Sequence, residues 1–138
     1  MAPQFDQVKV GDKLPPLTLP PISRKTLALY AGASGDHMAV HIDQDVARAA
    51  RYPDVFAHGM LTVAYLGRLL TNWVAQERIR EMSVRFVAIT HLYNAPMCTA
   101  EVIEKLEHAG EKRVRVAVKA ENQYGEVKIV GEAVLAIA

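Results

Sequence analysis

The residues best suited to chemistry lie in the segment SGDHMAVH, which runs from Ser34 to His41. Asp36 and His41 are five positions apart, and a regular helix or strand would not bring two side chains with that spacing to one point. On a loop, the carboxylate can orient a water molecule while the imidazole takes its proton. The pair therefore predicts general acid–base chemistry on water, which contributes about 10²–10⁴-fold to a rate.

A hydrogen-bond donor for a developing negative charge is predicted at Gly59, where an apolar helix begins. Glycine lets a carbonyl oxygen approach the backbone N–H closely, and the helix dipole has the sign that stabilises an enolate. Acid–base groups beside such a donor suit the addition of water to a double bond conjugated to a thioester. We expect the remaining residues that line the site to be Ser34, His37, Met38 and His58.

Each candidate also has a purely structural interpretation. An aspartate after glycine is commonly a turn or cap residue, and His41 could simply hydrogen-bond the backbone before the next helix. The presence of both in one loop favours a functional site. His37 and His41 are four apart near Asp36 and Asp43, but no thiolate or second ligand pair accompanies them, so we expect no metal.

Composition restricts the class of protein. The 138 residues correspond to one domain, residues 1–138, and 51% of them are apolar. Sixteen basic and 15 acidic residues give a net charge of +1, which favours neither a nucleic acid nor a membrane surface as partner. Cys98 is the single cysteine and is expected to be a small buried side chain. Without a secretory signal or an apolar run of about twenty residues, we expect a cytoplasmic protein.

Cap residues predict two short helices around the candidate loop. Ser23 can cap a helix from Arg24 to about Ala33, and Asp43 can cap a second helix over about 44–50. Residues 34–42 between them are therefore expected to form a loop.

The second half of the chain predicts an antiparallel sheet around a helix. The longest helix begins near His58 and is apolar on nearly its whole circumference, so we expect other structure to enclose it. Apolar residues then alternate with polar ones in 82–86 and 113–119, and Val87 and Ile89 are expected on the outer face of the sheet. We expect an α+β fold in which the sheet wraps one central helix, with free edges that favour a dimer. Turns are predicted at Ala109-Gly110 and Tyr124-Gly125.

These residues carry a family resemblance. The chain resembles the MaoC-like, R-specific enoyl-CoA hydratases of the hydratase 2 type, which have the hotdog fold. Their signature combines a tyrosine, Ser/Thr-Gly-Asp, an Asn-Pro pair, an aliphatic residue before histidine, and His-Gly at the start of the central helix. The matching positions are Tyr30, Ser34-Gly35-Asp36, Val40-His41 and His58-Gly59-Met60.

The resemblance implies a reaction and its partners. Asp36 and His41 would activate water for syn addition to a trans-2-enoyl thioester, giving an R-3-hydroxyacyl thioester, or would catalyse the reverse dehydration. The Gly59 N–H would hold the thioester oxygen. No cofactor is implied beyond coenzyme A or an acyl carrier protein as the carrier of the substrate. The chain is also similar to the catalytic subunit of mycobacterial-type heterodimeric dehydratases, which implies a homodimer or a heterodimer with a second hotdog subunit.

One departure leaves two alternatives open. Met38-Ala39 stands where the family has Asn-Pro, which removes a polar side chain and a stiff residue from the loop. A non-catalytic acyl-binding or partner subunit is the alternative that this change favours. The other alternative is an acyl-CoA thioesterase, because many hotdog proteins hydrolyse thioesters.

Overall fold

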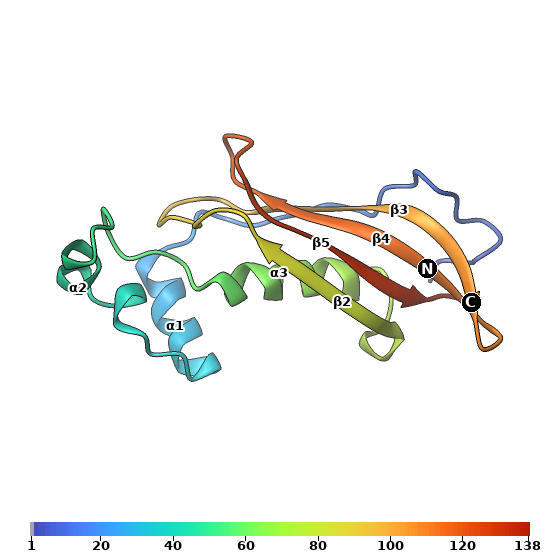
Figure 1. The fold of residues 1–138 in the computed structure, drawn as a ribbon, viewed down its shortest axis with the longest axis horizontal. Helices are drawn as coiled ribbons and strands as arrows, with labels where there is room; N and C mark the ends of the chain where they lie inside the picture. Colours follow the sequence, from blue (N-terminus) through green and yellow to red (C-terminus); the bar gives the residue numbers. More distant parts are fainter. Residues whose placement is uncertain (1) are drawn as a thin grey trace.

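The central helix α3, Gly59–Thr71, lies beneath a five-stranded antiparallel sheet in the computed structural model, which describes residues 2–138 (Figure 1). The strands follow the order β1-β3-β4-β5-β2 across the sheet. The predicted α+β arrangement is therefore confirmed. The remaining elements are β1 (Leu17–Thr18), α1 (Arg24–Ser34), the 3-10 turn η1 (Ala39–His41), α2 (Gln44–Ala49), the 3-10 turn η2 (Gln76–Arg78), β2 (Ile79–Phe86), β3 (Met97–His108), β4 (Glu111–Glu121) and β5 (Val127–Ala136).

Alternation along the long strands builds the core. In β4 every second residue faces α3 and is buried, as in the run Val114, Val116 and Val118. Val116 pairs with Val102 of β3 on one side and with Ala133 of β5 on the other, so the inner faces of three strands form one apolar surface. Leu66 and Leu70 of α3 pack on that surface, and their burial fixes the helix against the sheet.

The predicted hairpin turns are confirmed. Ala109 and Gly110 both have positive φ, at 50° and 79°, the conformation that a two-residue turn between twisted strands requires. This turn sets the register of β3 against β4, in which His108 pairs with Glu111.

The cap residues also act as predicted. The Ser23 hydroxyl accepts the Thr26 N–H at 3.2 Å, and the Asp43 carboxylate accepts the Asp45 N–H at 2.9 Å. Gly35 ends α1 with φ 76°, and its N–H donates to the Ala31 carbonyl. The candidate loop is therefore fixed at both of its ends by helix caps.

The expected enclosure of α3 on all sides is wrong for a single chain. The sheet covers one face of the helix, while Met60, Ala64 and Arg68 form an exposed row at intervals of four residues. Met60 is 57% exposed, although it is apolar. The neighbouring strand β2 is an edge strand and ends at Phe86, which is 54% exposed. Apolar surface thus remains open beside the free edge of the sheet.

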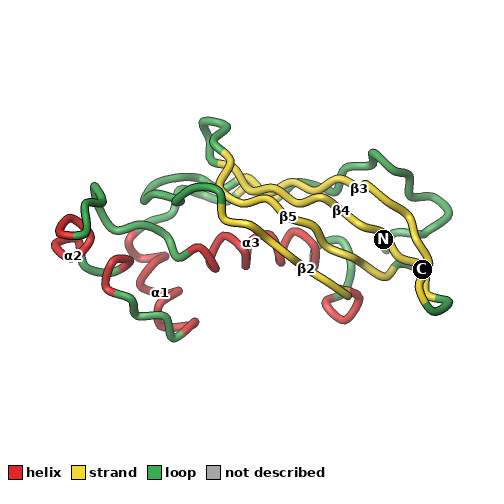
Figure 2. The backbone as a smooth tube through the Cα atoms, in the orientation of Figure 1, coloured by secondary structure: helices red, strands yellow, loops and turns green. Residues whose placement is uncertain are grey.

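The segment leading into α3 lies between two other connections. His58 contacts Asp36 of the loop after α1, and the Ala57 N–H donates to the Thr90 carbonyl of the β2–β3 connection. Figure 2 shows all three toward the end of the sheet where α3 begins. A second apolar cluster supports them, with Leu27 of α1, Ala47 of α2 and Leu61 of α3 among its buried members. Among residues 2–138, no helix has both the length and the apolar character that crossing a membrane requires.

Candidate active site

The structure brings Asp36 and His41 together and adds His58 to them. Each of the three side chains offers one oxygen or nitrogen atom, and these atoms all lie within 4.8 Å of one another. Asp36 comes from the loop after α1, His41 from the turn η1 and His58 from the residue before α3. The acid–base pair therefore shares one small volume with a second imidazole.

A backbone carbonyl orients His41. The ring is buried, and its Nδ1 lies 2.7 Å from the carbonyl oxygen of Phe56. Because a carbonyl can only accept, Nδ1 carries the proton and Nε2 keeps a free lone pair. Burial lowers the pKa of His41 below its ordinary value of 6.5; the nearby His58 acts in the same direction, and Asp36 in the opposite one. These features suit a neutral imidazole that accepts a proton at Nε2.

Short-range hydrogen bonds shape the loop that carries Asp36. The Ser34 hydroxyl donates to the Tyr30 carbonyl at 2.7 Å and accepts the Asp36 N–H at 3.2 Å. One carboxylate oxygen of Asp36 accepts the Met38 N–H at 3.2 Å, which closes an Asx turn. Ser34 therefore shapes the loop, and the Asp36 carboxylate stays exposed to solvent.

His58 lies at the centre of the cluster. It is 1% exposed, and its Nε2 lies 3.0 Å from the backbone carbonyl oxygen of Asp36. Its ring stacks on that of His41, with centroids 4.1 Å apart and planes at 28°. Tyr30 of α1 packs edge-on against its ring, at 4.8 Å. His58 thus contacts α1, the loop after it and the turn η1, three successive segments that precede it in the sequence.

The start of α3 opens onto a pocket. Gly59 is the first residue of the helix, so no carbonyl within the helix can accept its N–H. A Cβ atom at this position would lie 2.6 Å from Cε1 of Phe86, so a side chain here would require that exposed ring to move. The pocket has a volume of about 340 Å³ and is lined by Gly59, Phe56, Ala57, residues 86–90 and Ile129. Phe56 belongs both to the pocket and to the side-chain cluster, because it lines the pocket while its carbonyl orients His41.

Two predicted residues lie outside the cluster. His37 is exposed, and its Nδ1 lies 3.2 Å from the Gly35 carbonyl oxygen. Met38 is 63% exposed and contributes its backbone N–H to the turn at Asp36. The Met38 side chain therefore replaces the family asparagine without removing this hydrogen bond.

The pocket wall at residues 86–90 was not predicted from the sequence. Val87 and Ile89 were expected on the outer face of the sheet, but they lie beyond the end of β2 and line the pocket. Past the strand Val87 and Ala88 are exposed and Ile89 is half-buried, so the apolar residues there do not continue β2.

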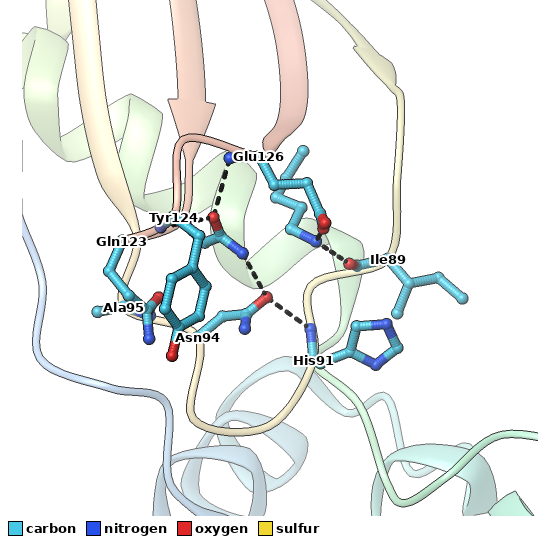
Figure 3. A network of polar contacts seen from close by, with 9 residues as sticks. Ile89, His91, Asn94, Ala95, Gln123, Tyr124 and Glu126 are labelled. Carbon is cyan, nitrogen blue, oxygen red and sulfur yellow. Dashed lines mark hydrogen bonds and ion pairs between the residues drawn. The ribbon is translucent and has the colours of Figure 1, made fainter.

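A buried lysine holds this wall. Lys128 of β5 is 2% exposed; its ammonium donates to the Ile89 carbonyl at 2.7 Å and pairs with Glu126 (Figure 3). The Lys128 carbonyl accepts the N–H groups of Val87 and Ala88. Burial lowers the pKa of Lys128. A lysine within a strand normally points to solvent, so no local pattern indicated this contact.

Asparagine side chains connect the two loops next to this lysine. Asn122 accepts the backbone N–H groups of Tyr124 and Glu126 at 3.0 and 2.9 Å, which fixes the β4–β5 turn. Its amide donates to the side-chain oxygen of Asn94, which also accepts the His91 N–H (Figure 3). Gln123 adds two further bonds between these loops, since its side chain accepts the Ala95 N–H and donates to the Tyr93 carbonyl. The β2–β3 connection is therefore tied to the β4–β5 turn by both side chains.

The cluster suits proton transfer better than cation binding. His41 Nδ1 and His58 Nε2 already face backbone carbonyls, which leaves one nitrogen on each ring.

Comparison with known proteins identifies the family. The model of the MaoC like domain matches residues 7–124, and the chain belongs to this family. The chain is 29% identical to the fatty acid synthase subunit beta of Saccharomyces cerevisiae over 132 residues. This aligned region covers 92% of the chain but 6% of that subunit. Over 48 residues it is 40% identical to the 3-hydroxyacyl-thioester dehydratase Z of Mycobacterium tuberculosis, covering 35% of the chain and 32% of the dehydratase. The chain thus spans a minor part of both relatives.

Solved structures confirm the hotdog fold. The R-hydratase PhaJ1 from Pseudomonas aeruginosa has a TM-score of 0.85 and 29% identity, over 97% of this chain and 85% of PhaJ1. The ChsH1–ChsH2 complex from Mycobacterium tuberculosis contains a chain with a TM-score of 0.82 and 22% identity, over 96% of this chain and 100% of that one. The second similarity shows the fold alone.

Removing the lysine anchor should destabilise the protein. Lys128→Ala leaves the Ile89 carbonyl without its donor, and we expect the free energy of unfolding to fall by about 1–3 kcal/mol. Lys119→Ala, at a half-exposed lysine of β4, is the matched control and should change it by less than about 0.5 kcal/mol. Urea unfolding measures both, and equal effects of the two variants would show that the anchor does not contribute.

Proposed function

We propose that this chain catalyses the reversible hydration of trans-2-enoyl thioesters to R-3-hydroxyacyl thioesters. The observation that carries the proposal is the convergence of the Asp36 and His41 side chains on His58, the residue directly before the first N–H of α3. Membership of the MaoC-like family and the similarity to an R-hydratase support this reaction class. The dehydratase named among the relatives fits the reverse direction.

The geometry supports a single-face addition. Asp36 orients a water molecule and His41 Nε2 takes one of its protons, while the water oxygen bonds to Cβ of the enoyl group. The electron pair of the double bond moves onto the thioester oxygen, where the Gly59 N–H stabilises the enolate. His41 then returns the proton to Cα on the same face. The net change is the addition of one water molecule, in the syn sense.

The proposed reaction needs no cofactor. Coenzyme A or an acyl carrier protein enters as the carrier of the acyl group, and neither a metal nor a nucleic acid takes part. The pocket lined by Phe86, Val87 and Ile89 supplies apolar surface for the carbon chain next to Gly59.

The alternative functions are less well supported. A non-catalytic subunit was favoured by Met38-Ala39, but the Met38 N–H still holds the Asp36 carboxylate in its turn. A thioesterase remains testable with the same substrates, because it releases free thiol from saturated and unsaturated acyl-CoA alike. A hydratase acts on the unsaturated one alone and releases none.

Loss of either acid–base group should abolish most activity. We expect Asp36→Asn and His41→Ala each to lower kcat/KM for crotonyl-CoA by about 10²–10⁴-fold, because each removes a group that orients or deprotonates water. Loss of enoyl absorbance measures turnover, and a parallel thiol assay on butyryl-CoA tests for hydrolysis.

His37→Ala is the matched control for these variants. His37 is a histidine of the same loop, but it is exposed and outside the cluster, so activity should stay near that of the unchanged protein. Full activity in both Asp36→Asn and His41→Ala would contradict the assignment of the pair.

The pH profile should report His41. Burial lowers the pKa of its imidazole below 6.5, and the base is active when neutral. Activity should therefore persist as the pH falls through 6.5 and decline only below it. A plot of log kcat/KM against pH measures this acid limb, and a midpoint above 6.5 would contradict the assignment of His41 as the base.

A second hotdog subunit would cover the apolar surface that one chain leaves open. Met60 and Phe86 lie beside the free edge of β2, where another sheet can pair. We propose a homodimer, with a related chain as the alternative partner, since a chain of similar fold occurs in the ChsH1–ChsH2 complex.

Oligomeric state should depend on this surface. Sedimentation of the purified chain should give the mass of two copies. Met60→Lys should shift this mass toward that of one copy, because dimer formation would bury the charged ammonium of the new lysine. Val10→Lys, at an apolar residue that is similarly exposed outside the edge, is the matched control. A monomer mass for the unchanged chain at all concentrations would rule out the homodimer.

A further inference from the structure

His58 has the properties of a residue that acts through its neighbours. The proposed mechanism uses Asp36 and His41 but gives no role to His58, the third and most buried member of the cluster. Within residues 2–138 its Nδ1 is buried without a hydrogen-bond partner, and such orphaned atoms are uncommon. Burying a nitrogen without a hydrogen bond is unfavourable, and an apolar side chain would avoid that cost. A histidine at this position is therefore explained only if its other nitrogen, Nε2, makes a useful contact.

That other nitrogen makes a long-range contact. Nε2 lies 3.0 Å from the Asp36 carbonyl oxygen, which can only accept, so Nε2 carries the proton of the ring. The Asp36 loop is otherwise held by hydrogen bonds within residues 30–38. The His58 contact therefore joins the carboxylate loop to α3.

The position of His58 in the chain extends this effect. It directly precedes Gly59, so the residue that holds the Asp36 backbone also fixes the N–H donor at the start of α3. Its ring stacks on His41 at 4.1 Å, which restrains the imidazole whose Nδ1 is bound by Phe56. One side chain thereby sets the relative positions of the carboxylate, the base and the N–H donor.

We propose that His58 is a positioning residue of the hydration site, whose Nε2–H holds the Asp36 backbone against the start of α3 and whose ring orients His41. This inference rests on the proposed function. His58 needs no contact with substrate for this role, because its donor is occupied by a backbone carbonyl.

Two variants separate positioning from packing. His58→Phe keeps an aromatic ring of similar size against Tyr30 and His41 but removes the donor, whereas His58→Gln keeps an N–H donor at nearly the same distance from Cα. We expect kcat to fall by about 10- to 100-fold in His58→Phe with KM changed less than twofold, and to recover at least partly in His58→Gln.

Amide hydrogen exchange gives a readout that does not require turnover. Exchange within residues 34–38 should be faster in His58→Phe than in the unchanged protein and slower again in His58→Gln, because the bond to the Asp36 carbonyl is lost in the first variant and replaced in the second. Melting temperatures identify any variant that has lost its structure. If the unchanged protein has no hydratase activity, the proposed function fails while this exchange measurement still tests the contact.

Three outcomes would overturn the inference. They are unchanged kcat in His58→Phe, unchanged amide exchange of residues 34–38 in that variant, and equal losses of kcat in His58→Phe and His58→Gln when both are folded. The last result would assign His58 to proton transfer with substrate.

Discussion

Two hydrogen bonds from histidine rings to backbone carbonyls hold this site together. His41 Nδ1 binds the Phe56 carbonyl across 15 residues, and His58 Nε2 binds the Asp36 carbonyl across 22. The loop that carries the carboxylate has mostly local contacts and exposed side chains, so it depends on these bonds for its place. Each bond also selects a tautomer, since a carbonyl accepts but cannot donate. Position and protonation are therefore set by the same contacts.

The sheet supplies the rigid half of the site. Leu66 and Leu70 fix α3 on the inner faces of β3, β4 and β5, and this fixes the N–H at the start of the helix. Lys128 joins the same sheet to the pocket wall through the Ile89 carbonyl. The proposed acyl pocket and N–H donor thus belong to the sheet and α3, while the proposed acid–base pair belongs to the loops. His58 lies where these two halves meet, which explains why one buried side chain contacts both.

Local signals in the sequence predicted the parts of the structure that local physics controls. The caps at Ser23 and Asp43 and the alternation in β4 correspond to contacts within a few residues, and the loop spacing of Asp36 and His41 placed both side chains in one region. The anchoring role of Lys128 and the central place of His58 depend on neighbours more than twenty residues away, so no local pattern indicates them. The expected enclosure of α3 was wrong because periodicity shows that a surface is apolar, but it does not say whether the same chain covers it.

The most direct test of the proposed site is the stereochemistry of water addition to crotonyl-CoA in deuterium oxide. The pair on one face of the substrate predicts 3-hydroxybutyryl-CoA of R configuration, with one deuterium at C2 on the face that received the hydroxyl group. Chiral chromatography and NMR of the product measure both features. An S product, deuterium on the opposite face, or release of free thiol without hydration would contradict the proposed arrangement of Asp36, His41 and Gly59.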